Sequence, residues 1–120
     1  MVMWKALALV VTLGIATPVS TATSGLTPRT QKALVLAEVY YGAPIFVTSA
    51  YRNKEHNKEV GGVANSKHLF GEAIDIRMPN SATQLNKLVW ALTLAGFTGL
   101  GIYQTHVHAD SRRNPTFWRN

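Results

Sequence analysis

Cysteine is absent from all 120 residues of the chain. The protein can therefore hold no disulfide, and it cannot close a structural zinc site with thiolates. Acidic residues are also scarce, with six against twelve lysines and arginines, which gives a formal net charge of +6 at pH 7. A balance this basic favours association with polyanions such as cell-wall polymers. The cations are scattered and form no recognition motif, so we expect no specific nucleic-acid partner.

Long apolar runs are missing as well. Near the N-terminus, Lys5 precedes an apolar run over residues 6–16, which ends before Pro18 and is shorter than the roughly twenty residues that span a bilayer. Small side chains then follow, up to Ala22. This pattern predicts a signal peptide over residues 1–22, export to the periplasm, the medium or the cell wall, and no stable membrane span. An uncleaved membrane tether is the alternative.

Residues 23–120 are enough for one compact domain, because 47% of the chain is hydrophobic. The pattern predicts a monomer of the α+β class, a small single domain with an antiparallel sheet flanked by helices and a zinc site on the sheet face. Strands are expected at 44–49, 73–78, 99–103 and 106–110, and helices at 27–42, 53–60 and 81–96. The core positions expected for the first helix are Ala33, Leu36, Ala37 and Tyr40, and those for the last are Leu85, Leu88, Val89, Leu92 and Ala95.

Two segments far apart in the sequence carry the candidate metal ligands. In the strand at 73–78 the isoleucines on either side of Asp75 belong to the buried face, so Asp75 must point away from the core. His106 and His108 are two residues apart, which places both on one face of their strand. His68 precedes Gly71, where the chain can turn sharply and return the imidazole over the strand. Two imidazoles and one carboxylate, from His68, His108 and Asp75, are a ligand set of a catalytic zinc that keeps its fourth position free.

These motifs resemble those of peptidase family M15, the zinc D-alanyl-D-alanine carboxypeptidases and murein endopeptidases. The run Ser66-x-His68-x-x-Gly71-x-Ala73-x-Asp75, followed by His106-x-His108-x-Asp110, carries the resemblance. A second region, Thr48-Ser-Ala-Tyr51-Arg52 followed by His56-Asn57 and Gly61-Gly62, is also similar, with Ala50 where glycine is usual. The resemblance extends from about residue 27 to the end. It implies one zinc ion (Zn2+) per chain held by His68, Asp75 and His108, with Arg52 as an anion stabiliser.

The chain departs from the family at one position. Many members carry an acidic general base three residues before the last ligand, and this chain has Thr105 there. Threonine cannot take a proton from the attacking water at neutral pH, whereas the ordinary pKa of histidine lies near the working range of a base. We therefore predict His106 as the general base and Glu72 as the second candidate. Asp110 is expected to orient a ligand histidine.

The resemblance implies a zinc metallopeptidase that hydrolyses peptide bonds in peptidoglycan stem peptides or cross-links, as a D,D-carboxypeptidase or an endopeptidase. The alternative is a non-catalytic module, cell-wall-binding or virion-associated, that retains the zinc scaffold. The substitution at Thr105 favours this alternative. Phe117 and Trp118 are open to two interpretations, as a wall of the substrate pocket or as a cover for the core.

Overall fold

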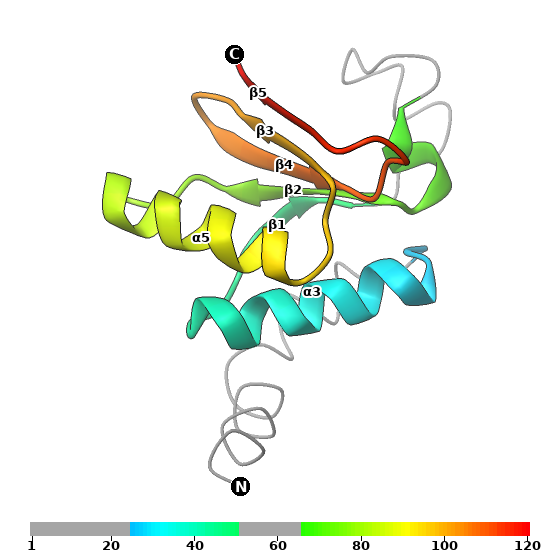
Figure 1. Cartoon of the computed structure of the whole chain (residues 1–120), viewed down its shortest axis with the longest axis horizontal. Helices are drawn as coiled ribbons and strands as arrows, with labels where there is room; N and C mark the ends of the chain where they lie inside the picture. Colours follow the sequence, from blue (N-terminus) through cyan, green and yellow to red (C-terminus); the bar gives the residue numbers. More distant parts are fainter. Residues whose placement is uncertain (1–24, 51–65) are drawn as a thin grey trace, which may run out of the picture.

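The computed structural model of the chain describes residues 25–50 and 66–120 (Figure 1). The predicted signal peptide over 1–22, the polar helix over 53–60 and Arg52 lie outside these residues. The described elements are, in order, α3 (Pro28–Tyr41), β1 (Val47–Ser49), the short 3-10 helix η1 (Lys67–Phe70), β2 (Ala73–Arg77), α5 (Ala82–Leu94), β3 (Gly99–Ile102), β4 (His106–Asp110) and β5 (Thr116–Arg119). The predicted α+β class is confirmed.

The five described strands form one sheet in the order β1-β2-β4-β3-β5. The first four pair in antiparallel fashion as predicted, but β5 pairs in parallel with β3, so the sheet is mixed. Strand β5 was not predicted from the sequence, because all of its residues are exposed except the half-buried Trp118. A strand with no buried face has no alternating pattern from which to predict it.

Helices α3 and α5 lie on the same side of the sheet and pack against each other (Figure 1). The core between helices and sheet includes fully buried side chains from every layer: Leu34, Ile45, Ile74, Ile76, Leu88, Leu92 and Val107. Because strand residues alternate between faces, the side chains next to these core residues on β2 and β4 point to the other face of the sheet. That face carries the candidate site.

Helix α3 begins and ends at the predicted residues, but its buried face differs from the prediction. The hydroxyl of Thr27 accepts a hydrogen bond from the N–H of Thr30 at 3.2 Å, and Gly42 ends the helix. The core residues are Leu34, Ala37 and Tyr41, whereas the expected Leu36 and Tyr40 are 42% and 46% exposed. The prediction was wrong here because residues 33–37 are all apolar, so the periodicity does not select one face.

Helix α5 follows its prediction more closely. The Ser81 hydroxyl accepts a hydrogen bond from the N–H of Gln84 at 3.1 Å, and Leu88 and Leu92 are buried as expected. Leu85 and Val89 pack against the core from its edge. Among the residues that the structure describes, no helix is both long and apolar enough to cross a membrane.

Candidate active site

Strands β2 and β4 bring two of the predicted ligands side by side. Asp75 lies opposite His108 in their antiparallel register, and Arg77 lies opposite His106. The neighbours of Asp75 and His108 that point the other way, such as Val107, are fully buried in the core. The alternation predicted from the sequence therefore places Asp75, His106 and His108 on one face of the sheet.

The turn after η1 brings in His68. Gly71 has φ +69°, a left-handed conformation that favours glycine, and a Cβ at this position would collide with the carbonyl oxygen of Gly25. At the start of η1, the Ser66 hydroxyl accepts a hydrogen bond from the N–H of His68 at 3.2 Å. These contacts direct the imidazole over β2, and the His68 side chain is only 1% exposed.

The three candidate ligands form one cluster. His108 Nδ1 lies 3.1 Å from Asp75 Oδ1, and His68 Nε2 lies 3.3 Å from the same oxygen. One ligand atom from each residue lies within 4.8 Å of the other two. Asp75 and His108 are 15% and 14% exposed, so the cluster opens to solvent on the side of these two residues. Two imidazole nitrogens and a carboxylate oxygen in this arrangement suit a zinc ion.

Each imidazole is held through the nitrogen that faces away from the cluster. His68 Nδ1 lies 2.6 Å from the carbonyl oxygen of Ala50, which can only accept, so Nδ1 is the protonated nitrogen. His68 Nε2 then has a lone pair, is buried and has no hydrogen-bond partner. His108 Nε2 lies 2.7 Å from Asp110 Oδ2, which turns Nδ1 toward Asp75. A histidine bound through its outer nitrogen and unpartnered at its inner one fits a metal ligand.

The carboxylates of the site stay ionised. Burial raises the pKa of Asp75, but the hydrogen bond from His108 and the proximity of both imidazoles outweigh it and hold this pKa well below its usual range. Asp110 is fully buried, which also raises its pKa. The hydrogen bonds from Arg112 and His108 outweigh burial, so the net direction of this pKa is downward. Burial lowers the pKa of His108, and its two carboxylate partners more than reverse this, so the net direction is upward. His108 thus has a carboxylate oxygen within hydrogen-bond distance of each of its ring nitrogens.

His106, the predicted base, lies beside the cluster. Its Nε2 is 4.0 Å from Asp75 Oδ1, and its Nδ1 is 2.9 Å from the hydroxyl of Thr105. The imidazole is 30% exposed and therefore open to substrate and water. Glu72 instead lies 3.6 Å from Lys67 Nζ, in an exposed ion pair. His106 therefore stays the predicted base, and Glu72 stays the second candidate.

Two residues around the site, Arg112 and Tyr103, were not predicted from the sequence. Arg112 donates to both oxygens of Asp110, from Nε to Oδ1 at 2.9 Å and from Nη2 to Oδ2 at 2.6 Å. Its guanidinium carbon lies 4.5 Å from the centre of the Trp118 ring, and that ring is 5.5 Å from His108. A spacing of two residues between Asp110 and Arg112 was the available signal. Tyr103 was expected only as the end of a strand, and its ring stacks on His106.

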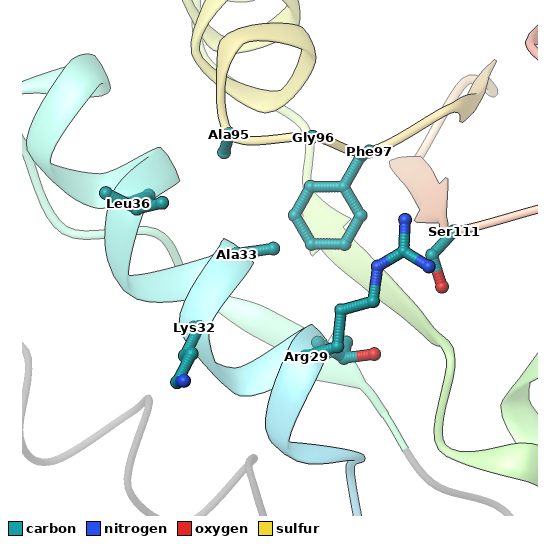
Figure 2. Close-up of a pocket in the computed structure, with 9 residues that line it drawn as sticks. Arg29, Lys32, Ala33, Leu36, Ala95, Gly96, Phe97 and Ser111 are labelled. Carbon is teal, nitrogen blue, oxygen red and sulfur yellow. The ribbon is translucent and has the colours of Figure 1, made fainter.

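Two hollows among the described residues lie away from the three candidate ligands. One, of about 410 Å³, is bounded by α3, Phe97 and the segment after α5, with Arg29 and Lys32 at its rim (Figure 2). Another, of about 510 Å³, lies at the end of α3 beside Phe46 and Arg77. Neither is lined by His68, Asp75 or His108. The chemistry of the three candidate ligands, rather than the depth of a hollow, identifies the candidate site.

The comparisons with known proteins agree with this geometry. The family model for Peptidase M15 matches residues 9–110. A search of curated proteins gives no match. Among solved structures, the chain is similar to the L-Ala D-Glu endopeptidase ChiX of Serratia marcescens, with 20% identity, a TM-score of 0.56, and coverage of 68% of this chain and 70% of that one. At this identity the likeness shows a shared fold. The family match covers most of the chain, including both histidine motifs, and the chain belongs to peptidase family M15.

Proposed function

We propose that the chain is a zinc-dependent peptidase that cuts peptide bonds in peptidoglycan, with His68, Asp75 and His108 as the metal ligands. The observation that carries the proposal is the buried, unpartnered Nε2 of His68 within 3.3 Å of Asp75. An unsatisfied buried nitrogen costs about 1–3 kcal/mol of stability. A bound cation would remove this cost, because it would take the lone pair.

The residues around the three proposed ligands have separate roles in the proposed reaction. Zinc, when bound, supplies a Lewis acid that polarises a peptide carbonyl and acidifies water. His106 accepts the proton of the attacking water at Nε2 and returns it to the leaving amine. Asp110 holds the His108 ring through its outer nitrogen. Arg52, which lies outside the described residues, is proposed to stabilise the oxyanion or to bind a terminal carboxylate of the substrate.

The proposed substrate is a stem peptide or cross-link of peptidoglycan. The structural neighbour is an L-Ala D-Glu endopeptidase by its title, which supports endopeptidase activity, and the resemblance to the family also leaves D,D-carboxypeptidase activity open. We propose that residues 1–22 direct export, so that the domain over 23–120 acts as a monomer in the periplasm or at the cell wall. Its excess of positive charge suits an anionic polymer.

A non-catalytic, wall-binding role is the second candidate, and Thr105 is the observation that favours it. Incubation of the zinc-loaded protein with purified peptidoglycan, followed by mass spectrometry of the soluble fragments, separates the two. We expect released peptides whose new ends identify the bond, and none after chelation of the metal. Binding to peptidoglycan with no fragment released under any metal condition would establish the second candidate.

A further inference from the structure

An aromatic contact holds the imidazole of His106 in one plane. The Tyr103 ring stacks on it with centroids 4.6 Å apart and planes 7° from parallel. On the ring edge, the Thr105 hydroxyl forms a hydrogen bond with Nδ1 at 2.9 Å. Stacking fixes the plane and the hydrogen bond fixes the rotation within it. Together they turn Nε2 toward Asp75, whose Oδ1 is 4.0 Å away.

Trp118 in turn holds Tyr103. The indole N–H donates a hydrogen bond to Tyr103 Oη at 2.9 Å. Trp118 lies opposite Gly101 in the parallel pairing of β5 with β3, and its indole covers this glycine so closely that a Cβ at position 101 would collide with it. The register of β5 against β3 therefore sets the position of the indole.

The same indole also contacts Arg112, which supports a partner of His108. Arg112 lies over the Trp118 ring at 4.5 Å and pairs with Asp110, which binds His108 Nε2. One side of Trp118 thus supports the predicted base through Tyr103, and the other supports a predicted metal ligand through Arg112. A residue that only covered the core would require neither the indole N–H nor its alignment with a phenol.

We propose that Tyr103 and Trp118 are positioning residues for His106, and that the hydrogen bond between them fixes the plane in which His106 takes a proton. The inference rests on the proposed function, since it assigns His106 as the base. Neither aromatic residue touches the reacting atoms. Their effect should therefore appear in turnover and in the position of the His106 ring, with substrate affinity and metal binding retained.

Two conservative variants test the hydrogen bond. Tyr103→Phe keeps the stacked ring and removes Oη, and Trp118→Phe keeps an aromatic face for Arg112 and removes the N–H. A neutral hydrogen bond is worth about 0.5–1.5 kcal/mol, so we expect kcat to fall about twofold to tenfold in each, with KM and zinc affinity within about twofold. The kcat of the double variant should be no lower than that of the less active single variant, because both substitutions remove the same hydrogen bond.

A control variant and a more disruptive variant give the lower and upper limits of the expected loss in kcat. Arg119→Lys changes an exposed residue on the same strand and keeps its charge, so it should keep the kcat of the wild type. Tyr103→Leu removes the stacking altogether and should approach the loss seen in His106→Ala. Wild-type kcat in both Tyr103→Phe and Trp118→Phe, multiplicative losses in the double variant, or an equal loss in Arg119→Lys would each overturn the inference.

NMR of the zinc-loaded protein gives a readout that does not depend on activity. The ring current of Tyr103 should shift the carbon-bound protons of the His106 imidazole upfield. We expect the shift to persist in Arg119→Lys, to be reduced in Trp118→Phe and to vanish in Tyr103→Leu. If the wild type cleaves no peptide, the proposed function fails. The chemical shifts of His106 then test on their own whether Tyr103 and Trp118 position its ring. An unchanged His106 shift in Trp118→Phe would then reject it.

Discussion

Glu38 makes the stability of the domain depend on pH in a way that can be calculated. Its carboxyl is 1% exposed and accepts a hydrogen bond from the N–H of Ile45 at 2.9 Å. Burial raises the pKa of Glu38 from 4.5 to about 7, although the bond from Ile45 lowers it. Between these two values the unfolded chain loses the proton while the folded chain keeps it. The contribution of Glu38 is therefore fully present below pH 4.5 and is lost as the pH rises through about 7.

The size of this stability change follows from the difference between the two pKa values of Glu38. One pH unit is worth about 1.4 kcal/mol, so the rise from 4.5 to about 7 corresponds to about 3 kcal/mol of unfolding free energy. Glu38→Gln keeps an oxygen that can accept from Ile45 and has no proton to lose. We therefore expect the variant and the wild type to be about equally stable near pH 4.5, and the variant to be about 3 kcal/mol more stable at pH 8.

Urea unfolding of both proteins at a series of pH values, with the metal chelated throughout, measures this difference. Contributions from His108 and the other shared groups cancel when one protein is subtracted from the other. Glu38→Asn would be a poor control because it also removes volume, whereas Gln preserves it. A difference in unfolding free energy that stays constant from pH 4.5 to pH 8 would refute the reasoning.

Three further predictions concern the site and its supports. Gly101→Ala should destabilise the fold by about 1–3 kcal/mol, because its methyl group would displace the Trp118 indole; urea unfolding checks this, and unchanged stability would contradict the close contact. Asp110→Asn should weaken zinc binding about tenfold to a hundredfold, measured by competition with a chelator, since it weakens the support of His108 Nε2. His106→Ala should keep its zinc while turnover falls about a hundredfold to ten-thousandfold; near-normal turnover would transfer the role of base to Glu72.

The cluster could be anticipated from the sequence because strand alternation is a strong signal where one face is buried. Ile74 and Val107 identify the core side of β2 and β4, and they leave Asp75 and His108 on the other side. The spacing within a single segment cannot show that the two strands are neighbours. For that step the resemblance to a family was needed.

Other parts of the structure could not be predicted from the sequence. They depend on the pairing of distant segments, or on residues that show no periodic pattern. Strand β5 is mostly exposed, so nothing in Thr116–Arg119 predicts that it joins the sheet. The parallel register that places Trp118 over Gly101 follows from that pairing, as does the bond from the indole to Tyr103. The carbonyl of Ala50 that accepts from His68 could not be predicted either, since backbone groups carry no signature in the side-chain sequence.

The zinc content of the purified protein tests the central claim most directly. The wild type and Asp75→Ala would be loaded with zinc and dialysed in parallel against metal-free buffer. Elemental mass spectrometry would then measure the zinc bound per chain, and circular dichroism would check that each protein is folded. We predict about one zinc ion per chain in the wild type and almost none in a folded Asp75→Ala, because the carboxylate lies between both ligand imidazoles. Full zinc occupancy in folded Asp75→Ala would contradict the account.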